Sequence, residues 1–396
     1  MRLALLLDLS RLVLRASRPA PTGIDRVEFA YARFLRAGHG GARSVLWRSG
    51  RHVLLPDDGV AAFLDALEAA WRDGRSDHAE RAARRLRRWA LFATEADLLR
   101  TIGRSGAIYF NVSHHHLDRT EAFGRLAAAG AKIVVLIHDL IPLTHPEYAR
   151  PGEDQRHRAR LETVVRHAAA VIANSAATAT ALAGPLAARG ATIPVAAAPL
   201  GIDEPLPVPP APTKAPTFLC LGTIEPRKNH LLLLHLWRRF TEQGGAVPHL
   251  VLAGARGWEC EAVVDLLDRC VALRPHVTEA GAVDERGRSA LIRSARALLL
   301  PSFAEGYGLP VGEALAAGLP AIVSDLPALR EVGGDVPEYL DPLDAAAWAR
   351  AIRDYAADPS PRREAQLARL AGWRRPTWRE HFRIVDQLIA QVAGGG

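Results

Sequence analysis

The segment Leu298–Pro320, LLLPSFAEGYGLPVGEALAAGLP, combines two carboxylates with a glycine-rich loop. Its apolar run predicts a strand, and Pro310 opens a predicted helix at a position where its missing amide costs nothing. The free amides at the start of a helix bind anions. Glu305 before the loop and Glu313 in the first helical turn would repel a phosphate, but each carboxylate can accept hydrogen bonds from vicinal hydroxyls. The pattern predicts a ligand with a diphosphate between two polyols, which describes a sugar nucleotide. Alternatively, Glu313 is only a partner of the helix dipole and Glu305 a loop charge.

A basic pair follows the first strand of the second half of the chain. In the segment Phe218–Trp237, FLCLGTIEPRKNHLLLLHLW, Arg227 and Lys228 precede a predicted helix that Asn229 is expected to cap. Two cations at a helix entrance stabilise the charge that builds on a departing diphosphate. Such a pair is often a surface feature, but its place after a strand favours a ligand-binding loop.

Two positions in the first half also fall where ligands bind. His138 follows a predicted buried strand, Ile133–Ile137, and Gly23 lies in the loop APTGIDR, where backbone can approach a phosphate closely. A histidine at a strand end is often structural, but its position at the ligand side favours a functional role.

The histidine run at residues 114–116 does not predict a metal site. Consecutive residues of a strand point to opposite faces, so the run is a poor chelate. The chain also contains no D-x-D carboxylate pair, which argues against metal-assisted sugar transfer.

Short apolar runs alternate with amphipathic helical stretches, which predicts an α/β protein with parallel sheets. The segment 204–216, EPLPVPPAPTKAP, cannot form a helix or a central strand because its prolines lack amide donors. We therefore expect two doubly wound halves joined by this linker: an N-terminal domain over 1–203 and a C-terminal domain over 217–376. Ligands bind beyond the carboxyl ends of such strands, so the site is expected in a cleft where the two halves face each other.

Composition limits the class of protein. The 396 residues carry 50 Lys and Arg and 43 Asp and Glu, for a formal charge of +7, and 49% are hydrophobic. The acidic residues are interleaved with the basic ones, so we do not expect a nucleic-acid partner. Three cysteines without a C-x-x-C pair, and no apolar run of membrane-spanning length, predict a soluble cytoplasmic protein with free thiols. The basic stretch 72–100 is either a solvated arginine face or a helix that lies on an anionic membrane.

The sequence resembles the GT-B glycosyltransferases of family 4, the retaining, metal-independent group. The resemblance rests on Glu305-x7-Glu313, LGTIEPRKN, APLGID and PSFAEGYGLP, and TGIDR and HDLIPLTHPE are similar to a subset of bacterial polysaccharide mannosyltransferases that use GDP-mannose. It implies a GT-B fold whose last helix, near 377–392, returns to the first domain. It also implies a hexosyl donor, with mannose expected, and a glycan or lipid-linked acceptor.

The resemblance also implies roles for individual residues. Arg227 and Lys228 would hold the donor diphosphate, and Gly308 and Leu309 would offer it backbone amides, with Gly23 approaching from the first domain. Glu313 would bind the ribose, and Glu305 and His138 the transferred sugar. No metal or other cofactor, and no side-chain nucleophile, is expected. The alternatives are a non-catalytic sugar-nucleotide or polysaccharide-binding protein and an NAD-dependent oxidoreductase, but the latter needs a G-x-G-x-x-G turn that the sequence lacks.

Overall fold

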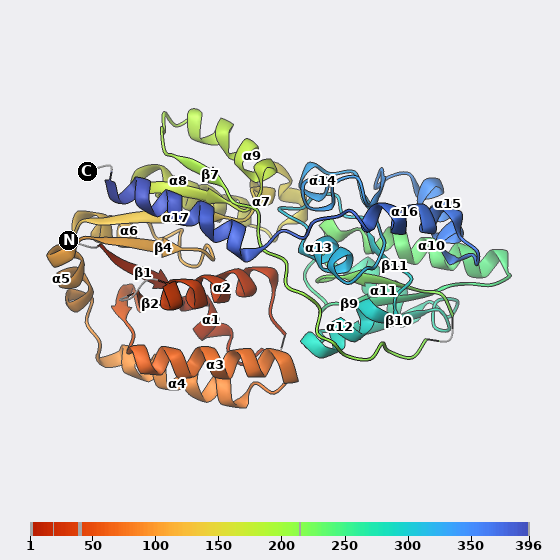
Figure 1. The fold of residues 1–396 in the computed structure, drawn as a ribbon, viewed down its shortest axis with the longest axis horizontal. Helices are drawn as coiled ribbons and strands as arrows, with labels where there is room; N and C mark the ends of the chain where they lie inside the picture. The colour runs from red at the N-terminus through yellow and green to blue at the C-terminus, as the bar shows by residue number, and fades with distance from the viewer. Residues whose placement is uncertain (1–2, 19, 39–41, 214, 395–396) are drawn as a thin grey trace. The chain divides into compact units, whose positions relative to one another are not determined.

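The computed structural model describes the chain except for residues 1–2, 19, 39–41, 214 and 395–396. The chain divides into two compact units. The first unit comprises residues 1–143, 152–200 and 378–396, and the second comprises 144–151 and 201–377. Both are α/β units built on a central sheet (Figure 1).

The first unit has a seven-stranded sheet in the order β3-β2-β1-β4-β5-β6-β7. All neighbouring strands are parallel except β2 and β3, which form an antiparallel pair. The strand order reverses between β1 and β4, which is where ligands bind in doubly wound sheets. The strands are β1 (Ala4–Asp8), β2 (Arg43–Arg48), β3 (Arg51–Leu54), β4 (Ala107–Asn111), β5 (Ala131–Ile137), β6 (Ala168–Ala173) and β7 (Val195–Ala197).

Helices cover this sheet and bury its central strands. Every residue of β4 is buried, as expected for a parallel strand covered on both faces. The helices are α1 (Ser10–Arg15), α2 (Gly23–Gly38), α3 (Asp57–Asp73), α4 (Asp77–Phe92), α5 (Glu95–Ser105), α6 (Thr120–Ala128), α7 (Ile141–Thr144), α8 (Glu153–His167), α9 (Ala176–Ala187) and α17 (Trp378–Gly394). The last helix, α17, belongs to this unit although the second unit precedes it in the chain.

The second unit has a six-stranded sheet, all parallel, in the order β10-β9-β8-β11-β12-β13. Its order reverses between β8 and β11. The strands are β8 (Thr217–Leu221), β9 (His249–Ala253), β10 (Val277–Gly281), β11 (Ala297–Leu300), β12 (Ala321–Ser324) and β13 (Glu338–Leu340). The helices are α10 (His230–Gln243), α11 (Glu261–Arg269), α12 (Glu285–Ser294), α13 (Leu309–Ala316), α14 (Pro327–Gly333), α15 (Ala345–Ala356) and α16 (Pro361–Leu370), with short 3-10 turns at Pro146–Tyr148 and Pro226–Lys228.

The proline-rich segment adopts neither helix nor strand in its described residues, 204–213 and 215–216. It is grouped with the second unit, where the Leu206 amide donates to Ser289 Oγ at 3.0 Å and the Ala211 amide to the Ala290 carbonyl at 3.3 Å. The stretch of the first unit that precedes this segment ends at Leu200, three residues before the predicted boundary.

A second departure from the predicted division concerns residues 144–151. We expected them in a continuous first domain over 1–203, but they pack in the second unit. The Tyr148 ring is stacked on Phe303, with centroids 5.4 Å apart, and Trp258 donates a hydrogen bond to the Tyr148 carbonyl at 3.3 Å. Arg150 lies over the Trp258 ring at 4.9 Å. These aromatic contacts are long-range in sequence, so the local pattern did not reveal them.

Candidate functional site

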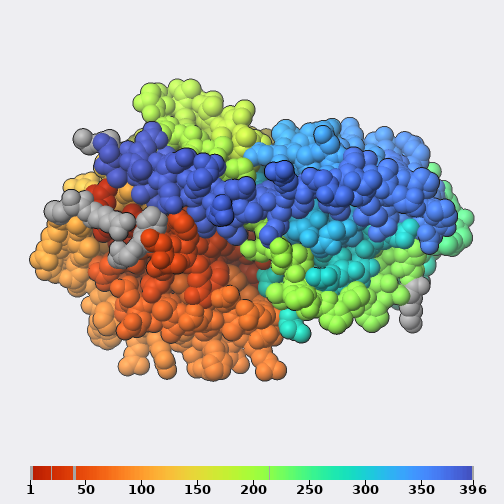
Figure 2. All heavy atoms as spheres, viewed as in Figure 1, coloured from red at the N-terminus to blue at the C-terminus, as the bar shows by residue number. Residues whose placement is uncertain are grey.

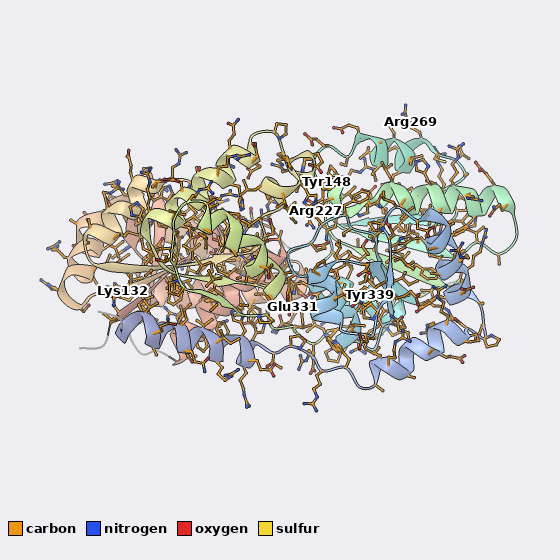
Figure 3. The ribbon with its side chains drawn as sticks, turned by 90° about the horizontal axis from the view of Figure 1, so that it is seen from above. Lys132, Tyr148, Arg227, Arg269, Glu331 and Tyr339 are labelled. Atoms are coloured by element: carbon orange, nitrogen blue, oxygen red, sulfur yellow. The ribbon has the colours of Figure 1, made fainter. Side chains whose placement is uncertain are left out.

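The loops after β8 and β11 meet at the reversal of strand order in the second unit. The Phe303 amide, in the loop after β11, donates to the Arg227 carbonyl, in the loop after β8, at 2.8 Å. This contact places the PSFAEGYGLP loop beside the basic pair, as the two sequence motifs predict. Figure 3 shows the Arg227 side chain in this unit.

Glu305 is the centre of this arrangement. Its Oε1 atom accepts hydrogen bonds from Lys228 Nζ at 2.5 Å and Ser302 Oγ at 2.7 Å, and its Oε2 atom accepts from Arg227 Nη1 at 2.9 Å. Burial raises the pKa of Glu305, but Lys228 and Arg227 outweigh it and lower that pKa to about 2. Glu305 is therefore an ionised acceptor at neutral pH.

A further carboxylate pairs with the same arginine. Glu225 Oε1 lies 2.6 Å from Arg227 Nε, and the Glu225 side chain is only 4% exposed. Two cations and two carboxylates thus form a buried, nearly neutral cluster. Such a cluster holds the guanidinium and ammonium in fixed positions, so that an arriving anion meets donors that are already oriented.

Glycines let the backbone approach closely around Lys228. A Cβ atom on Gly254 would lie 1.8 Å from the Gly222 carbonyl oxygen, so the end of β9 can lie against the end of β8 only with glycine there. A Cβ on Gly222 would lie 3.3 Å from Lys228 Cε, at a φ of +137°. The space around these glycines is narrow, and the buried aliphatic stem of Lys228 occupies it.

The helix α13 begins as the sequence predicts. Gly308 is its N-cap with φ +102°, Leu309 is its first residue, and Pro310 follows. A Cβ on Gly308 would lie 2.5 Å from Leu329 Cδ2, so glycine is required on both conformational and steric grounds. No partner is described for the Gly308 and Leu309 amides, as expected for a helix N-terminus.

The second carboxylate of the motif, Glu313, lies beyond the first turn of α13, so the prediction that it sits in that turn is wrong. It is 7% exposed and forms an ion pair with Arg288 of α12. Arg288 also pairs with Glu285 at 2.6 Å. Burial lowers the pKa of Arg288, but the two carboxylates outweigh it and raise the value above its usual range. Arg288 thus fixes the direction of the Glu313 carboxylate.

Sequence reasoning missed Arg288 and Ser302 as members of the site. The spacing Glu285-x-x-Arg288 on one helix face gives a local ion pair, but nothing local links Arg288 to Glu313. Ser302 lies three residues before Glu305, inside a motif that the sequence did single out.

Asn229 does not cap α10 through its side chain, so that expectation is wrong. Its backbone has a left-handed φ of +52°, and its side-chain amide donates to the Pro342 carbonyl at 3.1 Å. The left-handed backbone ends the short 3-10 turn that carries Arg227 and Lys228, and it turns the chain into α10.

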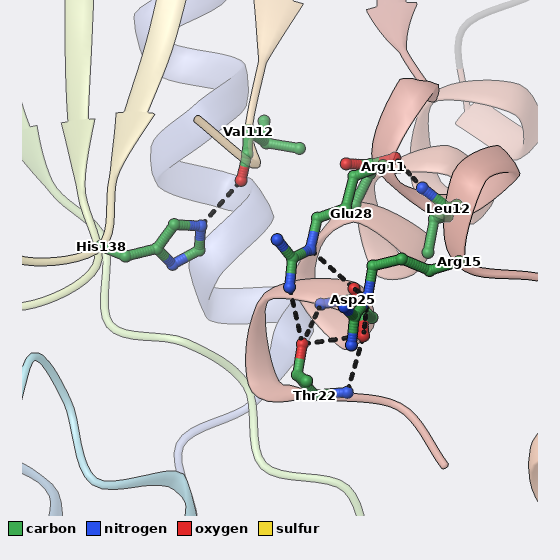
Figure 4. A network of polar contacts seen from close by, with 8 residues as sticks. All are labelled: Arg11, Leu12, Arg15, Thr22, Asp25, Glu28, Val112 and His138. Carbon is green, nitrogen blue, oxygen red and sulfur yellow. Dashed lines mark hydrogen bonds and ion pairs between the residues drawn. The ribbon is translucent and has the colours of Figure 1, made fainter. Parts of the chain in front are cut away.

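In the first unit, the loop before α2 is held by a capping box. Thr22 precedes α2, and its amide and hydroxyl both donate to Asp25 Oδ2 at 2.8 Å (Figure 4). Arg11 Nε and Arg15 Nε also donate to the Asp25 carboxylate, at 2.6 and 3.1 Å. Burial opposes ionisation, but the two arginines lower the pKa of Asp25. Gly23 is the first residue of α2.

His138 follows β5 and is 6% exposed. Its Nε2 atom lies 2.8 Å from the Val112 carbonyl oxygen (Figure 4). Its amide donates to His114 Nε2 at 3.3 Å. Burial lowers the pKa of His138 to about 4, so the ring is neutral at pH 7. Because a carbonyl only accepts, Nε2 carries the proton and Nδ1 is left as an acceptor.

Residues 114–116 do not lie on a strand, which corrects our geometric argument. They follow β4, and His114 and His116 have positive φ. Within the described part of the chain, no group of three or more His, Cys, Asp or Glu side chains is arranged to hold a metal ion.

The structure thus gathers Arg227, Lys228 and Glu305 into one hydrogen-bonded cluster. Gly308 and Leu309 begin the helix that follows this loop, and Glu313 pairs separately with Arg288. Gly23 and His138 belong to the first unit.

Two Rossmann-like units, each with a reversal of strand order, confirm the predicted α/β class, and the fold is that of the GT-B glycosyltransferases. The HepE protein of Anabaena, solved in complex with UDP, is similar in fold with a TM-score of 0.66 and 16% identity. The alignment covers 98% of this chain and 100% of that one.

Residues 203–369, which lie within the second unit, match the family model of glycosyl transferases group 1. O-antigen chain mannosyltransferase B of Escherichia coli is 34% identical over 160 residues, 40% of this chain and 42% of that protein. The serotype-specific mannosyltransferase WbdA of E. coli is 27% identical over 254 residues, 59% of this chain and 31% of that protein. The chain therefore spans less than half of the length of these relatives.

Proposed function

We propose that the protein is a retaining, metal-independent glycosyltransferase that moves a hexose, mannose in the first instance, from a nucleoside-diphosphate sugar to a glycan or lipid-linked acceptor in bacterial polysaccharide assembly. The observation that carries the proposal is the cluster of Arg227, Lys228 and Glu305 at the reversal of strand order, beside the open N-terminus of α13. The mannosyl donor rests on the two mannosyltransferase relatives. GDP as its nucleotide rests on the resemblance of the TGIDR and HDLIPLTHPE segments.

The donor diphosphate would bind to Arg227 and Lys228 and to the Gly308 and Leu309 amides. These groups are already oriented, so they stabilise the charge that grows on the diphosphate as the bond to the sugar breaks. That is the same electrostatic role that a bound metal ion plays in other transferases. The solved complex of HepE with UDP supports nucleotide binding by a protein of this fold.

Glu313, held by Arg288, would accept hydrogen bonds from the ribose hydroxyls. Glu305 is fully ionised and already accepts three hydrogen bonds, so its contribution is to position the two cations and to accept a further hydroxyl of the sugar. It does not act as a general acid, because its pKa lies far below neutral pH.

His138 would accept a hydrogen bond from a hydroxyl of the donor sugar through its unprotonated Nδ1 atom. Gly23, the first residue of α2, would bring backbone to the phosphate from the first unit. The acceptor hydroxyl would attack from the face that the diphosphate leaves, and the leaving phosphate would take its proton, so that the configuration at the anomeric carbon is retained. Positioning and charge stabilisation then supply the rate acceleration.

We place the reaction in the cytoplasm, which fits the three free thiols. None of the helices that the structure describes has the length and apolar character needed to span a bilayer.

The decisive experiment is a thermal-shift screen with GDP-, UDP- and TDP-sugars, followed by measurement of nucleoside diphosphate release with the donor that binds. We expect one class of donor to raise the unfolding midpoint and Arg227→Ala to abolish release. Absence of binding to every donor would overturn the proposal. Binding without turnover on any acceptor extract would instead indicate a sugar-nucleotide-binding protein.

A further inference from the structure

The basic stretch at residues 72–100 is not one helix. It covers the end of α3, all of α4 and half of α5, with Gly74 in left-handed backbone between the first two. The helices α3 and α4 lie side by side at one edge of the first unit (Figure 1), and in the space-filling view their orange atoms form part of its outer surface (Figure 2).

The outward face of α4 has an unusual composition. Its buried residues are Ala79, Ala83, Leu86 and Ala90. Arg81, Arg85, Arg88 and Phe92 follow one another at helical spacing on the opposite face. No ion-pair or hydrogen-bond partner is described for these three arginines.

The end of this face is apolar and exposed. Phe92 is 80% exposed, Leu91 54% and Trp89 52%, and these are three of the seven large hydrophobic side chains that are exposed among the described residues. Core packing does not explain them, because the opposite side of α4 already supplies the buried contacts. A cluster of exposed apolar side chains marks an interaction surface.

A pocket of about 460 Å³ opens beside Trp89 and Phe92. Three further arginines line it: Arg43, Arg100 and Arg104. Arg100 is paired with Asp97, whereas no partner is described for Arg43 or Arg104. The pocket therefore offers guanidinium groups next to aromatic rings.

We propose that this α4–α5 surface, formed by Arg81, Arg85, Arg88, Trp89, Leu91 and Phe92 with the adjoining arginine-lined pocket, docks the protein on a membrane that contains anionic phospholipids. The aromatic and leucine side chains enter the interface between headgroups and acyl chains, and the unpaired arginines contact lipid phosphates. Lipid suits the surface because it supplies negative charge and an apolar layer together. The acidic residues of α4, Asp77 and Glu80, lie in its first turn, away from Phe92.

The test is co-sedimentation of the full chain with phosphatidylcholine vesicles, with and without phosphatidylglycerol. We expect binding only to the anionic vesicles at low salt, and weaker binding as salt screens the charges. Arg85→Glu with Arg88→Glu should weaken it about tenfold or more, and Phe92→Ser should weaken it without changing the salt dependence. Leu343→Ser, at a site that is 77% exposed in the second unit, and Arg383→Glu on α17 are the matched controls.

Absence of binding to anionic vesicles at low salt, or equal losses in the control variants, would overturn the proposal. A dimer in size-exclusion chromatography that Phe92→Ser dissociates would identify a second copy as the occupant and would overturn it as well. None of these readouts uses the donor, so a failure here is distinguishable from a failure of the proposed transferase activity, which the thermal-shift screen reports separately.

Discussion

At the scale of single residues, Lys228 illustrates why residue type matters. The chain has only three lysines, against 47 arginines among its 50 basic residues, and Lys214 lies outside the described residues. Lys132 (Figure 3) donates a hydrogen bond of 2.6 Å from its Nζ atom to the Val392 carbonyl, near the end of α17. Lys228, by contrast, is 5% exposed and packs against Gly222 and Glu305. A compact ammonium fits this space, where a planar guanidinium would not.

Replacing Lys228 with arginine keeps the charge and is expected to lower kcat about tenfold or more, because the larger group displaces Glu305. Steady-state kinetics of nucleoside diphosphate release, with the unfolding midpoint recorded alongside, measures this. Lys132→Arg is the control and should leave kcat unchanged. Wild-type kcat in the Lys228→Arg variant would show that charge alone suffices.

Arg288→Leu tests the assignment of Glu313 to the ribose. Without its partner, the buried carboxylate loses its fixed direction, and we expect nucleoside diphosphate to bind about tenfold more weakly. Isothermal titration with the ordinary nucleotide and its 2′,3′-dideoxy analogue provides the readout. The wild type should discriminate between them strongly and the variant weakly. Arg286→Leu, exposed on the same helix, should retain discrimination; equal discrimination in all three proteins would contradict the assignment.

At the scale of elements, the ends of α13 show how the motif builds the site. Gly308 supplies the left-handed N-cap, and Gly318, with φ +76°, closes the helix in a Schellman motif in which the Leu319 amide donates to the Ala314 carbonyl at 2.8 Å. Two glycines thus fix an eight-residue helix whose N-terminus opens beside the basic pair.

We expect Gly308→Ala to lower the free energy of unfolding by about 1–3 kcal/mol, because alanine would be strained at this φ and would clash with Leu329. Gly184 lies in α9 with open space around it. Gly184→Ala should therefore raise the free energy of unfolding by about 1 kcal/mol. Urea unfolding of the two variants measures both. Equal stability of Gly308→Ala and wild type would show that the α13 N-terminus can rearrange.

At the scale of the whole molecule, buried histidines make stability depend on pH. Burial lowers the pKa of several of them, to about 3 for His52 and His115 and to about 4 for His138, His230 and His381. An unfolded histidine titrates near pH 6.5. Between about pH 6.5 and pH 4 the unfolded chain therefore binds more protons than the folded one, so stability falls as pH falls.

We expect the unfolding midpoint to be highest above about pH 7 and to drop steeply towards pH 5, by an amount on the order of 1 kcal/mol per buried histidine per pH unit. Thermal unfolding across this range measures the slope. His52→Phe should flatten it, because both ring nitrogens of His52 lack hydrogen-bond partners in the structure. His78→Gln, at an exposed position, should not. A midpoint independent of pH would contradict the prediction.

The local pattern of the chain determined much of this protein. An apolar run predicted the strand Ile133–Ile137, which is part of β5, and Pro310 marked the start of α13. These features depend on the backbone freedom of single residues and on hydrophobic periodicity over a few residues. Both are local properties of the sequence. The short edge strands β3 and β13 were not predicted, since they have only four and three residues.

The tertiary structure alone decided which side chains meet. The ion pair of Arg288 with Glu313, the hydrogen bonds of Arg227 and Lys228 to Glu305, and the stacking of Tyr148 on Phe303 each join residues that are far apart in the chain. Strand order creates these pairs, because it brings the loops after β8 and β11 together. The amino-acid sequence does not give the strand order directly. It therefore predicted which charged residues belong to the site, but not which of them form hydrogen bonds and ion pairs with each other.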